Sequence, residues 1–172
     1  MPLALEACAA ALADYPELNA RLESSSGGGD EIVYLDRYDL GVAVQTEQGL
    51  VVPVVRAANE KSLDELAAEV ERLADAARAG KLDPEEVRGS TFTVTSAGKL
   101  GGLLTTPIVN HPEVGILSIG RVAERPVVRD GEIVTRPTGT IAVTFDHRVV
   151  DGARAAEFGL AVIRRLELSG PQ

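Results

Sequence analysis

Several kinds of residue are scarce in this sequence, and each scarcity excludes a class of protein. The 172 residues include no tryptophan, one cysteine and two histidines, and aromatic side chains make up only 3%. The single cysteine, Cys8, cannot form an internal disulfide, which is typical of a reducing compartment. With so few aromatic residues, the core must be built from valine, leucine, isoleucine and alanine. The length and the 45% hydrophobic content predict one soluble globular domain.

The chain also lacks an excess of basic residues and has no long apolar run. The formal net charge of −9 argues against nucleic acid or an anionic membrane surface as a partner, because both require a basic footprint. A phosphorylated cofactor is not excluded, since it needs only a local cluster of donors. No stretch approaches the ~20 apolar residues of a membrane span, and no basic region followed by an apolar segment opens the chain. We therefore expect a cytoplasmic protein without a membrane partner.

The most informative stretch surrounds one of the two histidines. Residues 141–145 predict a buried strand and the pattern after Asp151 predicts a helix, so His147 lies at a strand-to-helix connection. Such connections can hold a polar group over a site. Asp151 follows His147 by four positions, and Gly152 permits a tight turn or the close approach of another backbone. For an isolated motif, the simpler interpretation is that Asp151 caps the helix and His147 is a half-buried structural histidine.

A second stretch combines hydroxyl side chains with glycines. Residues 92–95 predict a strand, and a glycine-rich loop runs from Ser96 to Gly102. Hydroxyl groups at a strand end suit a position where a substrate approaches the backbone. A loop that only turns the chain has the same composition, so both interpretations stay open. His111, which precedes a proline, is expected to be an exposed loop residue, and the two histidines have no metal-ligand spacing.

The remaining pattern predicts an alternation of helices and strands. The clearest helix begins with a capping box of Ser62 and Glu65. Pro53 cannot donate to a ladder, so its strand must lie at an edge or be bulged. Helices are expected at 2–15, 62–79 and after 151, strands at 31–35, 41–44, 50–55, 114–119 and 141–145, a mobile hairpin tip at 24–30, and a type I′ hairpin turn at 130–131.

The octet Phe-Asp-His-Arg-Val-Val-Asp-Gly at 145–152 resembles the active-site signature of the dihydrolipoamide acyltransferases and the related chloramphenicol acetyltransferases. The strand at 92–95, followed by Gly-x-x-Gly-Gly and Thr-Pro, is similar to a second signature of that family. The resemblance implies a two-layer α/β sandwich, in which a mixed β-sheet carries helices mainly on one face. The 62–79 helix should pack on that sheet through Leu63, Leu66, Val70 and Leu73.

The same resemblance implies acyl transfer between dihydrolipoamide and coenzyme A in a 2-oxo acid dehydrogenase complex. His147 would be the base that ionises the attacking thiol, because imidazole has an ordinary pKa of ~6.5 and a thiol one of ~8.5. Thr95 would donate the hydroxyl that holds the oxyanion, with Ser96 as the runner-up, and Asp151 would fix the loop. No metal is implied. The glycines expected to support the site are Gly98, Gly101, Gly102 and Gly152.

The family also implies particular partners. A homotrimer would hold each site between two subunits, with coenzyme A entering from one end and a lipoyl group, carried by another domain or chain, from the other. Other subunits of the complex would be further partners. We expect residues 1–172 to form a single catalytic domain that lacks the family's first helix and strand, which would carry an arginine partner for Asp151. We also expect no lipoyl or peripheral-subunit-binding domain, and the short polar stretch at 165–172 predicts no assembly beyond the trimer.

Two other functions are compatible with these features. A non-catalytic, trimer-forming subunit would keep the fold without turnover, and a free-standing chloramphenicol-type acetyltransferase would act on a small diffusible acceptor. Nothing in the sequence identifies the acyl group as acetyl, succinyl or branched-chain. The expected lack of the family's first helix and strand is compatible with a trimmed protein, a natural short homologue or a decayed gene.

Overall fold

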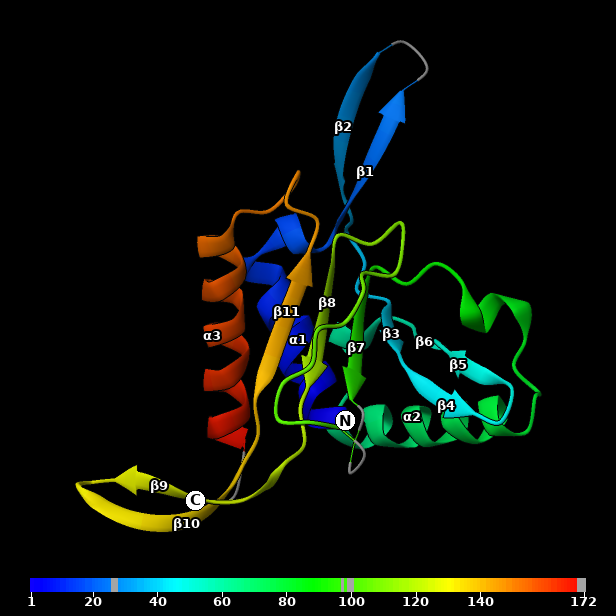
Figure 1. Cartoon of the computed structure of the whole chain (residues 1–172). Coiled ribbons are helices and arrows are strands. Elements are labelled where there is room, and N and C mark those ends of the chain that lie inside the picture. The colour runs from blue at the N-terminus through cyan, green and yellow to red at the C-terminus, as the bar shows by residue number, and fades with distance from the viewer. Residues whose placement is uncertain (26–27, 97, 99–100, 170–172) are drawn as a thin grey trace.

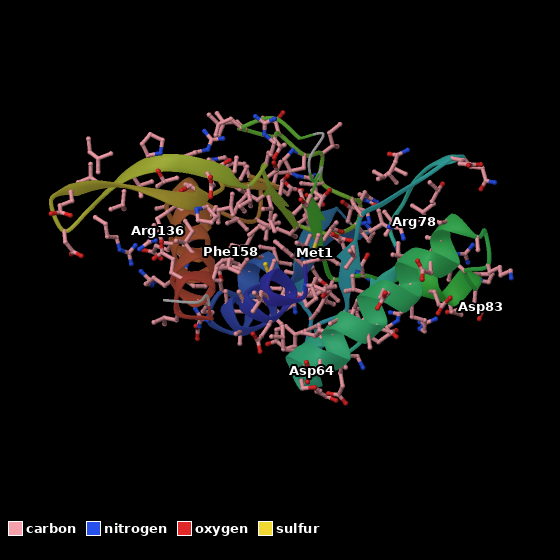
Figure 2. All side chains as sticks on the ribbon, turned by 90° about the horizontal axis from the view of Figure 1, so that it is seen from below. Met1, Asp64, Arg78, Asp83, Arg136 and Phe158 are labelled. Carbon is pink, nitrogen blue, oxygen red and sulfur yellow. The ribbon has the colours of Figure 1, made fainter. Side chains whose placement is uncertain are left out.

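The computed structural model describes residues 1–25, 28–96, 98 and 101–169. In this part of the chain, a five-stranded mixed sheet carries three helices on one of its faces (Figures 1 and 2). This arrangement confirms the expected two-layer α/β architecture. The sheet has the order β11 (Ile141–Phe145), β8 (Gly115–Ile119), β7 (Phe92–Ser96), β3 (Leu40–Val42) and β6 (Val54–Val55), with β8, β7 and β3 parallel and the two outer strands antiparallel to them.

The helix layer consists of α1 (Pro2–Asp14), α2 (Leu63–Arg78) and α3 (Gly152–Ser169), with α1 in the middle (Figure 2). The first of these, α1, starts on a proline and buries Cys8 completely. Phe158 of α3 is fully buried and meets Phe92 of β7 edge-on, with ring centroids 5.5 Å apart. One of the few aromatic pairs in the protein therefore joins the helix layer to the sheet, at a geometry that contributes about 0.5–1.5 kcal/mol beyond area burial.

The capping box predicted for α2 is present. Ser62 Oγ accepts the backbone N–H of Glu65, whose carboxylate accepts the backbone N–H of Ser62 at 2.7 Å. Leu66 and Leu73 are completely or almost completely buried, which confirms the apolar face. The prediction was wrong for Leu63, which is 37% exposed. Leu63 is the first helical residue, and Figure 2 shows its neighbour Asp64 at the free end of the helix, where no other element covers it.

Each of the strands predicted at 41–44 and 50–55 is divided in two. The end of the first and the start of the second pair as a separate hairpin of β4 (Val44–Thr46) and β5 (Gly49–Val51), while β3 and β6 belong to the main sheet. Pro53 lies at the break before β6 and only accepts, from the Val42 N–H at 2.8 Å. The break and the edge position of β6 confirm the expectation for Pro53.

The last strand was predicted to be buried, and this prediction was wrong. All five residues of β11 are half-buried, because β11 lies at the edge of the sheet. An apolar groove of about 490 Å³ lies between β11 and α3. The sequence pattern of the following helix predicts one apolar face of Ala155, Phe158, Val162 and Leu166; the first three are buried and Leu166 is half-buried.

Two hairpins project from opposite ends of the sheet (Figure 1). They are β1 (Ala20–Ser25) with β2 (Gly29–Tyr34), and β9 (Ala123–Arg129) with β10 (Glu132–Thr138). Asp130 and Gly131 have φ values of 52° and 84°, which confirms the type I′ turn. The irregular tip predicted at 24–30 was too long, because both strands continue into it and Ser24 Oγ donates to Asp30 Oδ1 at 2.7 Å. Its centre, Ser26 and Gly27, lies outside the described residues.

The connection from β7 to β8 crosses the sheet face that the helices leave open (Figure 1). The hydroxyls of Thr105 and Ser118 lie 2.6 Å apart and attach this connection to β8. His111, within it, is exposed, as expected. None of the helices in the described ranges is long and apolar enough to cross a membrane.

Candidate active site

The predicted oxyanion donor lies at the carboxyl end of β7. Val94 is fully buried on the helix side of the sheet, so the alternation of a strand directs Thr95 to the opposite face. Thr95 is half-buried, and its hydroxyl has no hydrogen-bond partner among the residues that the structure describes. The Ser96 hydroxyl, in contrast, accepts the backbone N–H of Gly98 at 3.2 Å. Of the two predicted donors, Thr95 therefore has the freer hydroxyl.

A pocket of about 220 Å³ opens beside this strand end, lined by Ser96, Gly98, Gly120, Arg121 and Val122. One wall is the loop after β7, whose carbonyl at Gly102 accepts the Arg121 N–H at 3.1 Å. Gly98 adopts a φ of 53°, a left-handed value that glycine reaches without strain. Gly101 donates its N–H to the Gly98 carbonyl at 3.2 Å. Of the four predicted glycines, Gly98 lines this pocket, whereas Gly152 lines the groove between β11 and α3. Residues 97, 99 and 100 of the loop lie outside the described residues.

The His147 turn is held in place by its neighbour Asp146. The Asp146 N–H donates to the Val114 carbonyl at 2.8 Å, and its carbonyl accepts the N–H groups of Val149 and Val150. Its carboxylate accepts the Arg148 backbone N–H at 3.0 Å. These bonds close a turn directly after β11 and leave His147 exposed upon it. The imidazole lies 5.4 Å from the Phe145 ring, centroid to centroid.

The charged neighbours of His147 pair with each other. The Arg148 guanidinium contacts the Asp146 carboxylate at 2.6 Å, and this hydrogen bond lowers the pKa of Asp146 below its ordinary value. Neither nitrogen of the His147 ring has a hydrogen-bond partner within the described part of the chain. The imidazole is therefore free to meet a substrate or another protein chain.

Asp151 occupies the N-cap position of α3, since its carbonyl accepts the Ala155 N–H at 3.0 Å. Its carboxylate is exposed, and no arginine in the described residues pairs with it. The two arginines nearest in sequence have other partners: Arg148 binds Asp146, and Arg154 binds Glu17 at 2.5 Å. Gly152 begins the helix in open space, with no atom within 4 Å of the position its Cβ would take.

The two predicted halves of the site lie at opposite ends of the sheet. Thr95 pairs with Ser118 on one side, and Ser118 pairs with Ala142 of β11 on the other. Because β11 runs antiparallel to β8, the five residues from Ala142 to His147 lead toward the opposite end of the sheet. The strand part of this segment, up to Phe145, alone spans roughly 10 Å. The intervening strand adds roughly 10 Å across the sheet. One chain therefore does not bring His147 and Thr95 together.

A buried carboxylate, which no sequence motif predicted, lies one residue before the Val114 carbonyl that binds the His147 turn. Glu113 is 5% exposed and accepts hydrogen bonds from Ser90 Oγ at 2.5 Å, Thr93 Oγ1 at 2.6 Å and Asn110 Nδ2 at 2.9 Å. Burial raises the pKa of its carboxyl. The next residue, Val114, carries the carbonyl that holds Asp146. The hydrogen bonds of Glu113 thus stabilise the segment just before β8, and the His147 turn is attached to this segment through the Val114 carbonyl. No group of three or more His, Cys, Asp or Glu in the described residues is arranged to hold a metal ion.

Known proteins share both the sequence and the fold. Residues 1–171 match the family of 2-oxoacid dehydrogenases acyltransferases (catalytic domain). The chain belongs to this family. It is 44% identical, over its whole length, to the dihydrolipoyllysine-residue acetyltransferase component of the pyruvate dehydrogenase complex from Bacillus subtilis. It spans only 38% of that relative's length.

Solved structures of related proteins agree with this assignment. The dihydrolipoamide acetyltransferase of Azotobacter vinelandii superimposes with a TM-score of 0.88 and 39% identity, over 96% of this chain and 67% of that one. A chloramphenicol acetyltransferase superimposes with a TM-score of 0.60 and 19% identity, over 96% of this chain and 76% of that one. The second likeness confirms the predicted fold.

Proposed function

We propose that this chain transfers an acyl group between dihydrolipoamide and coenzyme A, as an acyltransferase domain of a 2-oxo acid dehydrogenase complex. The observation that carries the proposal is the pair of free groups in the two family signatures, the Thr95 hydroxyl and the His147 imidazole. The names of the relatives favour acetyl as the acyl group and pyruvate dehydrogenase as the complex. The lipoyl group would come from another domain or chain.

The spacing of the residues supports the assignment of roles. In the Azotobacter vinelandii enzyme, a serine, a histidine and an asparagine were investigated for their role in the catalytic mechanism, and they are separated by 52 and by four positions. Thr95, His147 and Asp151 have the same two separations here. This register favours Thr95 over Ser96 as the hydroxyl donor. In this register Asp151 corresponds to the asparagine of that relative, which is a neutral amide, so we assign Asp151 a positioning role that needs no ionised partner.

The proposed reaction uses each free group once. The His147 imidazole removes the proton from the thiol of coenzyme A, and the thiolate attacks the thioester carbonyl of acyl-dihydrolipoamide. The Thr95 hydroxyl donates a hydrogen bond to the oxyanion of the tetrahedral intermediate. The intermediate collapses, the carbon–sulfur bond to dihydrolipoamide breaks, and the leaving thiolate takes the proton back from the imidazolium. The reverse reaction follows the same steps with the thiols exchanged.

The positions of the two groups require more than one copy of the chain. A base and an oxyanion donor must both lie within hydrogen-bond reach of one substrate, and they are at opposite ends of the sheet in a single chain. We infer that His147 of one copy completes the site of Thr95 in the next. A head-to-tail contact of this kind closes into a ring, and a homotrimer is the ring that the family resemblance implies.

The first test measures acyl transfer from an acyl-coenzyme A to free dihydrolipoamide. His147→Ala should abolish transfer, Thr95→Ala should lower the rate ~10²-fold or more, and Ser96→Ala, the matched control one residue away, should lower it less. Each variant should keep the mass in solution and the circular dichroism spectrum of the wild type. A wild type no faster than His147→Ala would refute the catalytic assignment and favour the non-catalytic subunit.

The shared site can be tested by co-expressing two variants. His147→Ala subunits keep Thr95, and Thr95→Ala subunits keep His147, so a mixed ring of three contains one intact site. Random assembly of equal amounts should return about a quarter of the wild-type rate. A mixture that stays as inactive as its two components would show that both groups serve the same site within one chain or no site at all.

A further inference from the structure

A buried hydroxyl lies beside Thr95 on the neighbouring strand. Thr95 of β7 and Ser118 of β8 are register partners in the parallel part of the sheet. Val94 and Leu117, the residues before them, are fully buried on the helix side, so both hydroxyl side chains leave the opposite face. Neighbouring strands lie roughly 4.7–4.9 Å apart, which lets the two side chains touch. Ser118 is therefore a cross-strand neighbour of the proposed oxyanion donor.

The Ser118 hydroxyl can make more hydrogen bonds than its contact with Thr105 uses. It is 2% exposed, and its oxygen lies 2.6 Å from Thr105 Oγ1, where either hydroxyl can be the donor. Each hydroxyl has one proton and two acceptor lone pairs, so when Thr105 donates, the proton of Ser118 is left over. On its other side Ser118 faces Ala142 of β11, which has no polar side-chain atom. Of the two cross-strand neighbours, only Thr95 offers a side-chain acceptor for this proton.

A hydrogen bond from Ser118 would fix the direction of the Thr95 hydroxyl. A buried polar hydrogen without an acceptor costs free energy, and hydroxyl side chains on facing positions of neighbouring strands pair with one another. Once the Thr95 oxygen accepts from Ser118, its own proton points away from that neighbour and is available to a substrate. The Thr95 hydroxyl has no partner within the described ranges, and hydrogen bonds in catalytic sites often tighten only when substrate binds.

We propose that Ser118 is a positioning residue, which donates a hydrogen bond to Thr95 Oγ1 and so aims the Thr95 proton at the oxyanion of the tetrahedral intermediate. This inference rests on the proposed function, because it takes Thr95 as the oxyanion donor. Chains of hydrogen bonds polarise one another, so the bond from Ser118 also makes Thr95 a stronger donor. Thr105 anchors the connection between β7 and β8 and is assigned no part in the reaction.

The first test is a double-mutant cycle in the acyl-transfer assay. Ser118→Ala should lower kcat about three- to tenfold and leave the KM values unchanged, because the oriented bond acts in the transition state. In a Thr95→Ala background, the same substitution should cause no further loss. The matched control is Thr105→Val, which breaks the same hydroxyl pair and should keep the wild-type kcat. Both variants should lose similar stability in urea, so a purely structural effect would lower the activity of both.

The second test needs no activity. Thr95→Cys places a thiol at the proposed acceptor, and the pH dependence of its alkylation gives the pKa of this thiol, while Cys8 is completely buried. A hydrogen bond to the thiolate favours the charged form and lowers the pKa. Adding Ser118→Ala should therefore raise the pKa of the introduced thiol by about 0.5 to 1, and adding Thr105→Val should leave it unchanged.

Three results would each overturn the inference, even in an active protein. They are losses that multiply in the double-mutant cycle, an equal loss of kcat in Thr105→Val, and a thiol pKa that does not respond to Ser118→Ala. The proposed function fails separately. A wild type without acyl transfer would refute that function, and the pKa of the introduced thiol would still decide whether Ser118 donates to the side chain at position 95.

Discussion

Removal of the buried carboxylate at position 113 should destabilise the protein strongly. In Glu113→Ala, the hydroxyls of Ser90 and Thr93 lose their acceptor, and these two residues are only 7% and 1% exposed. Each buried donor left unpaired costs roughly 1–3 kcal/mol, whereas the third donor, on exposed Asn110, can turn to water. Removing the carboxylate also removes the free-energy cost of burying it, which offsets part of this loss. We expect the free energy of unfolding to fall by about 2–4 kcal/mol.

Urea denaturation, followed by circular dichroism, measures this change directly. Glu85→Ala provides the control, because Glu85 is exposed and its carboxylate takes part in no hydrogen bond or ion pair among the described residues; its effect should stay within about 0.5 kcal/mol. If Glu113→Ala lost less than about 1 kcal/mol, the three hydrogen bonds would not stabilise the strand end as inferred here.

The same carboxyl gives a pH dependence of defined sign. Burial raises the pKa of Glu113, so the folded protein holds this proton more tightly than the unfolded chain. Stability from this group is therefore full below the unfolded pKa, ~4.3, and is lost as the pH rises through the raised folded pKa. Glu113→Gln does not titrate. The wild type should lose stability relative to Glu113→Gln across that window, and a difference that stays constant with pH would contradict the raised pKa.

Two further predictions concern a glycine pair and the cysteine. Gly120→Ala should destabilise the protein by about 1–3 kcal/mol in urea denaturation, because the new Cβ would lie 2.6 Å from both the Leu103 carbonyl oxygen and Thr140 Oγ1. The control, Gly152→Ala, should be neutral or slightly stabilising, because its Cβ would lie in open space. Cys8 should not react with a thiol reagent in the native protein at pH 8 and should react fully in urea, because burial raises the pKa of its thiol to about 12; modification of the native protein would refute this.

Local signals in the sequence predicted the elements that depend on a few neighbouring residues. The capping box of Ser62 and Glu65, the left-handed turn at Asp130-Gly131 and the break at Pro53 are all set by backbone chemistry within a few positions. For the same reason, the prediction of the strand at 141–145 was correct in its bounds and wrong in its burial. An apolar run reveals that a strand forms, but its position at the edge of the sheet depends on which strands pair with it.

The Glu113 network could not be predicted from the sequence, because it joins residues that are distant along the chain. Ser90 and Thr93 look like ordinary hydroxyl residues before and within a strand, and Glu113 looks like a loop residue after a proline. Only the parallel pairing of β7 with β8 brings the starts of both strands together, so that the carboxylate can accept from both hydroxyls.

The direction of one strand decides how the site must be assembled. The two signatures were identified in the sequence as the parts of one site, and within the described residues the Thr95 hydroxyl and the His147 imidazole have no hydrogen-bond partner. Had β11 been parallel to β8, His147 would follow the carboxyl end of the sheet and lie near Thr95 in the same chain. The antiparallel pairing, in which Phe145 faces Gly115, carries it to the opposite end. A chain folded in this way offers a hydroxyl at one end and an imidazole at the other. If it is catalytic, its activity must depend on contact between copies, and dilution that separates the subunits should abolish turnover while each chain remains folded.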